Sequence, residues 1–173
     1  MSLMSMPILT HLASEKDTKS IDRTGIKAVS SGHRTPKGVF CMAITPNYFA
    51  THQWHRELKR RGQRTMVAVD FRLSSDVRTW FGHYGRPHSE TTVGRAIHML
   101  METEDSRGFE FIIPRPIRKD EIIRIRMIRQ VIGWRYKPDA HGRKPCPCRV
   151  CLPRGTIKSS HLRRRLDPRG ELY

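Results

Sequence analysis

The apolar residues of this 173-residue chain fall in short runs of strand length, such as 39–44 and 66–73. In the second run Phe71 and Leu73 share one face of an alternating pattern, and Asp70 lies on the other. Such alternation is typical of a half-buried strand. A helix that crosses a membrane needs about 20 consecutive apolar residues, and no run approaches that length. The pattern predicts a sheet-rich chain and excludes a transmembrane protein.

Further strands and a first helix can be expected from local signals. Ser14, followed three residues later by Asp17, is typical of a helix start, and this helix is expected to end near Gly25. Apolar or alternating segments bounded by turn residues predict the remaining strands, at 7–12, 77–81, 108–113, 121–128 and 130–136.

Two more helices are expected in the middle of the chain. Thr45 and Pro46 are typical of a helix cap and first turn, which predicts a helix that runs to Gly62. Ser89 is expected to cap another helix, whose apolar residues recur at the spacing of one helix face: Val93, Ala96, Ile97, Leu100 and Met101. We therefore expect an α+β domain over 1–133 and a basic, cysteine-rich extension over 134–173.

The charge of the chain points to a polyanionic partner. There are 33 Lys and Arg residues against 16 Asp and Glu, which gives a net charge of +17. Such a field attracts phosphate-rich ligands such as nucleic acid, although it identifies neither fold nor reaction. The excess is steepest over 134–173, where a solubilising tail is the alternative reading. The expected nucleic-acid contacts are Arg143, Lys144, Arg163, Arg164 and Arg165.

Three of the four cysteines lie within six residues, at Cys146, Cys148 and Cys151, and His141 precedes them. No basic segment leads into an apolar stretch at the N-terminus, so we expect a cytoplasmic protein, whose thiols stay reduced. Three thiolates and an imidazole suit tetrahedral zinc, which predicts a structural zinc site. Cys41 or His161 could replace His141 as the fourth ligand. The alternative is three free thiols in a proline-rich turn.

Three segments carry side chains with possible chemical roles. His11 stands at the end of the first expected strand, and Tyr48 stands at the start of a helix after the strand 38–44. Glu110 is one carboxylate in an otherwise apolar strand. Such a residue either points outward or is buried at a cost of several kcal/mol unless it has a partner. A Glu110 that faces a cleft is therefore a functional candidate.

In order and local context, these segments resemble the His-Tyr-Glu signature of the ADP-ribosyltransferase fold. This fold is shared by diphtheria-toxin-like toxins, poly(ADP-ribose) polymerases and bacterial DNA-modifying relatives. The matching residues are His11, the segment 38–43 with Tyr48, and the segment 110–113. The resemblance covers about 7–128, and it implies split antiparallel sheets with peripheral helices, here followed by a zinc-knuckle-like basic tail.

Four positions depart from the family pattern. Leu12 replaces the glycine that follows the histidine, and Ser14 stands one place later than the family's hydroxyl residue. Phe40 replaces the first tyrosine of the second motif. Gly108 stands where enzymes that modify arginine have a second acidic residue, so the pattern for arginine acceptors is missing.

The resemblance implies NAD as a substrate and gives each residue a role. His11 would bind a hydroxyl of the nicotinamide ribose, while Tyr48, together with Phe40, would stack on the nicotinamide ring. Glu110 would bind the ribose 2′-hydroxyl and offset the positive charge that develops as the glycosidic bond stretches. Leu12 and Ser14 would complete the NAD-binding set. No metal takes part in this step, so zinc would be structural.

The sequence thus predicts an NAD-dependent mono-ADP-ribosyltransferase that modifies nucleic acid or a protein bound to it. One alternative is an RNA 2′-phosphotransferase on the same fold, which would use His11, Arg115 and Arg118. The other is a non-catalytic, zinc-containing nucleic-acid-binding protein, in which the signature is coincidental.

Overall fold

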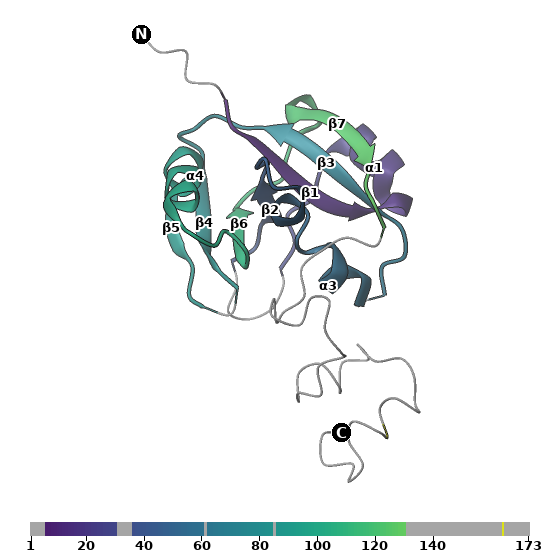
Figure 1. Ribbon diagram of the computed structural model, residues 1–173. Helices are drawn as coiled ribbons and strands as arrows, with labels where there is room; N and C mark the ends of the chain where they lie inside the picture. The colour runs from purple at the N-terminus through teal and green to yellow at the C-terminus, as the bar shows by residue number, and fades with distance from the viewer. Residues whose placement is uncertain (1–5, 31–35, 61, 85, 131–163, 165–173) are drawn as a thin grey trace.

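The computed structural model describes residues 6–30, 36–60, 62–84, 86–130 and 164 (Figure 1). The strand expected over 130–136 lies outside this part of the chain except for its first residue. The extension over 134–173 also lies outside it, apart from Arg164, whose side chain is exposed.

The described residues form an α+β structure around one seven-stranded antiparallel sheet, which confirms the predicted α+β class (Figure 1). The strand order is β5-β4-β6-β2-β1-β3-β7, so β5 and β7 are its edges. The strands are β1 (Ile8–Ser14), β2 (Val39–Ala43), β3 (Met66–Arg72), β4 (Arg78–His83), β5 (Ser89–Thr92), β6 (Phe109–Ile113) and β7 (Ile122–Met127).

Four α-helices lie between the strands of the described segments: α1 (Thr18–Thr24), α2 (Tyr48–Thr51), α3 (His55–Arg60) and α4 (Val93–Glu102). Helix α1 ends at Gly25, with φ of 83°, as the sequence predicts. The helix start predicted at Ser14 is wrong in part: Ser14 does occupy the N-cap position, but of a 3₁₀ turn rather than of α1, and the predicted capping box does not form. Ser14 is the last residue of β1, opposite Met66, and its side chain makes no capping hydrogen bond. A single 3₁₀ turn (Glu15–Asp17) separates β1 from α1.

The single helix predicted to run to Gly62 is also wrong, because the segment forms two short helices, α2 and α3. The turn between them carries Gln53, which is 3% exposed. Its side chain accepts a hydrogen bond from the backbone N–H of Gly108 at 2.5 Å and donates one to the carbonyl of Phe109 at 3.3 Å. These long-range bonds hold the turn against the start of β6, which local helix signals cannot reveal.

Ser89 does not cap α4, because Ser89–Thr92 is strand β5, paired with β4. Thr92 is the cap, and its side chain accepts a hydrogen bond from the N–H of Arg95 at 3.4 Å. The predicted stripe is otherwise present, since Val93, Ala96 and Leu100 are buried. Its last member, Met101, is 65% exposed, so the buried stripe is narrower than predicted.

Apolar clusters lie on both faces of the sheet. The larger contains residues of α1 and α4 packed on strand residues such as Leu9, Ala13 and Phe111, and we call its side the α4 face. The smaller contains Leu12, Met42, Met66, Ala68 and Ile128, with Trp54 and Leu58 of the α3 region against them, and we call its side the α3 face. No helix of the described residues is long and apolar enough to cross a membrane.

Strands β1 and β2 stay together for only a short distance. Their ladder has two residue pairs, Leu9 with Ala43 and Thr10 with Met42. By contrast, β1 pairs with β3 along its whole length. Beyond Thr10 the two strands diverge, so the sheet opens in its middle into a half formed by β1, β3 and β7 and a half formed by β2, β6, β4 and β5.

Candidate functional site

His11 is the first residue of β1 beyond this short ladder. Its Nδ1 lies 2.7 Å from the carbonyl oxygen of Phe40 on β2, so the side chain reaches across the place where the strands separate. Because a carbonyl only accepts, Nδ1 donates and Nε2 carries the lone pair of the neutral ring. Burial lowers the pKa of His11, and the Phe40 carbonyl opposes that shift only in part. His11 therefore presents a neutral imidazole at neutral pH.

The other residues expected to bind NAD surround this opening. Leu12 is buried in the α3-face cluster, and Ser14 and Phe40 are half-buried. Side chains alternate along a strand, so Leu12 lies on the face opposite to His11. Leu12 thus contributes its backbone, rather than a polar side chain, to the strand edge at the opening.

Tyr48 is the first residue of α2 and contacts two described residues. Its ring lies 4.1 Å from the ring of His52, measured between centroids. Its hydroxyl accepts a hydrogen bond from the N–H of Arg129 at 3.4 Å. His52 is 1% exposed and donates through Nδ1 to the carbonyl of Tyr48 at 2.8 Å. Burial lowers the pKa of His52, despite the opposing effect of that carbonyl.

Glu110 lies on β6 opposite Gly82 of β4. Its side chain is 13% exposed, and Oε1 lies 3.1 Å from Nε2 of His88, whose side chain is 8% exposed. The carboxylate is therefore largely buried beside a partner. This is one of the two arrangements expected for an acid in an apolar strand, the other being a side chain that points outward into solvent. His88 was not among the site residues predicted from the sequence.

The structure does not bring His11, Tyr48 and Glu110 into mutual contact. None of the hydrogen bonds, ion pairs or ring contacts of the described residues joins two of them. Strand alternation places His11 on the α4 face, whereas Glu110 alternates with Phe111 and leaves the sheet on the α3 face. Only a group that enters the opening between β1 and β2 could reach both faces.

A row of paired residues crosses the α3 face from Glu110 to β7, and Met42 separates Glu110 from the polar residues at its other end. Continuing the register of β2 and β6 by one residue places Met42 beside Glu110, and Met42 pairs with Thr10, which pairs with Asp70. Asp70 is 1% exposed and accepts hydrogen bonds from Arg124 and Arg126. Burial alone raises the pKa of Asp70, but these hydrogen bonds outweigh it and hold the pKa below its usual range.

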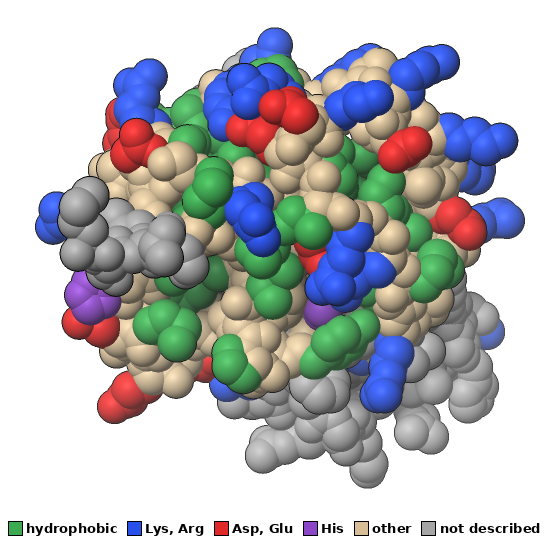
Figure 2. Space-filling model, turned by 90° about the horizontal axis from the view of Figure 1, so that it is seen from above, with side chains coloured by type: hydrophobic (Ala, Val, Ile, Leu, Met, Phe, Trp, Pro, Cys, Tyr) green, Lys and Arg blue, Asp and Glu red, His purple; other side chains and the backbone are tan. Residues whose placement is uncertain are grey.

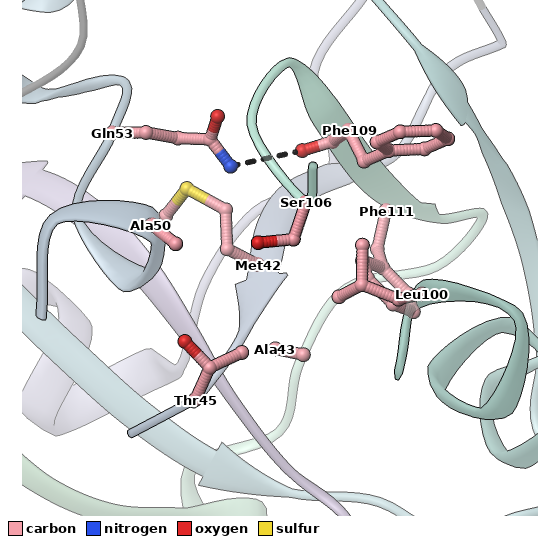
Figure 3. A pocket seen from close by; sticks show the side chains of 9 residues that line it. All are labelled: Met42, Ala43, Thr45, Ala50, Gln53, Leu100, Ser106, Phe109 and Phe111. Atoms are coloured by element: carbon pink, nitrogen blue, oxygen red, sulfur yellow. Dashed lines mark hydrogen bonds between the residues drawn. The ribbon is translucent and has the colours of Figure 1, made fainter. Parts of the chain in front are cut away.

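A small hollow lies near the end of β2, between α2, the end of α4 and the start of β6 (Figure 3). Its free space of about 10 Å³ admits about one water molecule and not a dinucleotide. The predicted catalytic residues do not line it. Its lining residues are Met42, Ala43, Thr45, Ala50, Gln53, Leu100, Ser106, Phe109 and Phe111.

The arginines of the phosphotransferase alternative are engaged in ion pairs. Arg115 forms two parallel hydrogen bonds to Glu121, at 2.6 and 2.8 Å, and Arg118 pairs with Asp120 at 3.1 Å. Figure 2 shows Lys and Arg side chains at many points of the face seen from above, with Asp and Glu among them. Part of the positive charge of the chain therefore lies on the described residues, in addition to the extension over 134–173.

The proposed zinc ligands His141, Cys146, Cys148 and Cys151, the alternative His161, and Arg143, Lys144, Arg163 and Arg165 lie outside the described residues. Cys41 is 2% exposed in the α4-face cluster. Burial, and secondarily the charge of Glu110, raise the pKa of this thiol, which opposes the thiolate form that binds metal. In the part of the chain that is described, no group of three or more His, Cys, Asp or Glu residues could hold a metal ion.

Comparison of the chain with protein-family models, with curated proteins and with solved structures finds no match.

Proposed function

We propose that the chain is an NAD-dependent mono-ADP-ribosyltransferase with the split-sheet fold of that family. The observation that carries the proposal is Glu110, a largely buried carboxylate on β6. The opening between β1 and β2 lies near it, because His11 of β1 is two strands from β6. Among the described residues, the ion pair of this carboxylate is made through one oxygen, Oε1, to His88. The other remains available for a ligand hydroxyl.

The proposed reaction breaks the bond between C1′ of the ribose and the nicotinamide nitrogen. The bond electrons leave with nicotinamide, which becomes neutral, and positive charge develops on the ribose. Glu110 binds the 2′-hydroxyl and stabilises that charge, an effect that a partly buried carboxylate exerts more strongly than an exposed one. An acceptor nucleophile then forms the new bond to C1′ from the opposite side, and its proton passes to a base or to solvent.

The other residues bind and orient NAD in this proposal. His11, neutral and held by the Phe40 carbonyl, offers Nε2 as an acceptor for a ribose hydroxyl. Tyr48 keeps one face of its ring against His52 and offers the other face to nicotinamide. The hollow of Figure 3 is too small for this ligand, so the proposal places NAD at the opening between β1 and β2.

We propose nucleic acid, or a protein bound to it, as the acceptor. The net charge of +17 supports this choice, since it favours encounter with phosphate-rich partners. The extension over 134–173 would dock the acceptor through Arg143, Lys144 and the arginines at 163–165. Cys146, Cys148, Cys151 and His141 would hold one structural zinc ion within it.

The test is incubation of the full chain with NAD labelled in the adenosine half, together with DNA, RNA or a cell lysate. We expect label in the nucleic-acid fraction or in nucleic-acid-bound protein, and none with Glu110→Gln. Glu102→Gln is the matched control, because this glutamate lies exposed on α4, beside His98. Equal labelling by wild type and Glu110→Gln would contradict the proposal.

A further inference from the structure

A glycine in β4 creates the space in which Glu110 meets a histidine. Gly82 lies opposite Glu110 on one side. On its other side, the register of Phe81 with Ser89 continues to Gly82 and His88. These three residues therefore form one row, with His88 directly before β5, Gly82 on β4 and Glu110 on β6, and the row has no side chain at its centre. The imidazole reaches the carboxylate over the bare backbone of Gly82.

A side chain at Gly82 would disturb this arrangement. A Cβ atom there would lie 3.1 Å from Cα of His88 and 3.2 Å from its Cγ and Cδ2. These distances are shorter than ordinary van der Waals contacts, so His88 would have to move. The glycine thus fixes how closely His88 can lie over the strand.

The contact between His88 and Glu110 involves one oxygen of the carboxylate. Nε2 of His88 lies 3.1 Å from Oε1 of Glu110, but the ring is not aligned for a hydrogen bond in this conformation. Nε2 of a histidine can donate to this oxygen in the tautomer in which that nitrogen carries the ring proton. Alignment of such contacts often improves only when the ligand binds. Oε2 of Glu110 makes no hydrogen bond to any described residue.

We propose that His88 is a positioning residue for Glu110, an inference that rests on the proposed function. His88 holds Oε1 and thereby restricts the rotation of the glutamate side chain. Oε2 is then presented to the ribose 2′-hydroxyl in one orientation. His88 acts through Glu110 and need not touch NAD, so its loss slows the chemical step without weakening the binding of NAD.

The experiment measures kcat and KM for nicotinamide release from NAD by the full chain and its His88 variants. His88→Leu removes the donor, and we expect kcat to fall by about ten- to a hundredfold, the scale of a misplaced catalytic group, with KM within about twofold. His88→Gln carries an N–H at the same distance from Cβ and should restore most of kcat. His98→Leu is the matched control, since His98 lies 3.7 Å from Glu102 on the exposed face of α4.

Two further variants keep the inference open to refutation if the leucine variant does not fold. His88→Asn keeps a polar amide that is one carbon too short to reach Glu110, so it should lose kcat where His88→Gln keeps it. Gly82→Ala should lower kcat because its methyl group displaces His88. Equal kcat in His88→Asn, His88→Gln and wild type would overturn the role of His88.

Failure of this inference differs from failure of the proposed function. Wild-type protein that releases no nicotinamide refutes the proposed function and, with it, the role of His88. An active wild type whose His88→Leu variant folds and keeps its kcat refutes only the role of His88. A rise in KM at constant kcat would also overturn the inference, because it would place His88 in NAD binding.

Discussion

Asp70 is the most buried charged residue of the described structure, and its neutralisation should destabilise the fold strongly. Its carboxylate is 1% exposed and accepts hydrogen bonds from Nε of Arg124 at 2.8 Å and from Nε and Nη2 of Arg126 at 2.8 and 3.1 Å. These bonds attach the edge strand β7 to β3. Asp70→Asn keeps the size of the side chain and removes the charge.

The size of the expected loss in the free energy of unfolding follows from how exposed the two arginines are. Arg124 is 63% exposed, so solvent screens its share to below about 1 kcal/mol. Arg126 is 23% exposed, and removing one partner of a buried pair costs about 3–5 kcal/mol. The remaining amide oxygen of Asn keeps one acceptor, worth about 1 kcal/mol. We therefore expect a loss of about 3 kcal/mol in the free energy of unfolding, or a fall in Tm of roughly 10 °C.

Urea unfolding followed by circular dichroism measures this loss. Asp105→Asn is the control, because its ion pair with Arg107 is 2.7 Å long but about half exposed on both sides. That variant should lose less than about 1 kcal/mol. A loss below about 0.5 kcal/mol in Asp70→Asn, the usual range for surface substitutions, would refute the reasoning.

The same residue predicts how stability depends on pH. The folded-state pKa of Asp70 lies below the ordinary value of 3.8, so the unfolded chain binds its proton first as pH falls. The contribution of Asp70 is complete above the unfolded-state pKa and is lost as pH falls from about 4 through the folded-state pKa. The difference in stability between wild type and Asp70→Asn should shrink over that range. A constant difference down to pH 2 would contradict this reading.

Three other predictions concern separate parts of the chain. Thr92→Ala removes the cap of α4 and should lower stability by about 0.5–1 kcal/mol in urea unfolding. Burial lowers the pKa of His52 below 6.5, so acidification from pH 7 to 5 should destabilise the wild type more than His52→Asn, because the unfolded wild type takes up that proton at a higher pH than the folded one. Metal analysis of the purified chain should return one zinc ion per molecule, and no zinc with freely titratable thiols would contradict the site at Cys146, Cys148 and Cys151.

Local periodicity predicted which residues face the core in those strands and helices where burial of apolar side chains alone determines the buried face. The alternation in 66–73 placed Phe71 and Leu73 on one face, and both lie in the α4-face cluster. The apolar spacing of α4 likewise identified Val93, Ala96 and Leu100 as core residues. In both elements the apolar face was predicted correctly, although Asp70 on the other face of β3 is also buried and Met101 of α4 is exposed.

The predictions failed where tertiary contacts override local signals. Ser89 has the chemistry of a helix cap, but pairing with Phe81 of β4 makes it a strand residue. The bonds of Gln53 to Gly108 and Phe109 connect positions about 55 residues apart and divide the expected helix. No pattern within a short window could show either interaction.

The candidate site was only partly predictable. Glu110 stood out because a carboxylate in an apolar strand requires an explanation. Its partner His88 lies 22 residues away, and the pair depends on the β4–β5 hairpin and on the absence of a side chain at Gly82. The signal that could have identified it is the glycine within a strand, which often marks a close approach.

The most direct test of the central claim is nicotinamide release from NAD by purified wild type and Glu110→Gln, followed by chromatography. The account predicts release by the wild type and a loss of about a hundredfold or more in kcat for the variant, the scale seen when a group that stabilises charge in the transition state is removed. Unchanged unfolding of Glu110→Gln in urea would show that the fold is intact. Nicotinamide release by the variant at the wild-type rate, or no release by either protein, would contradict the account.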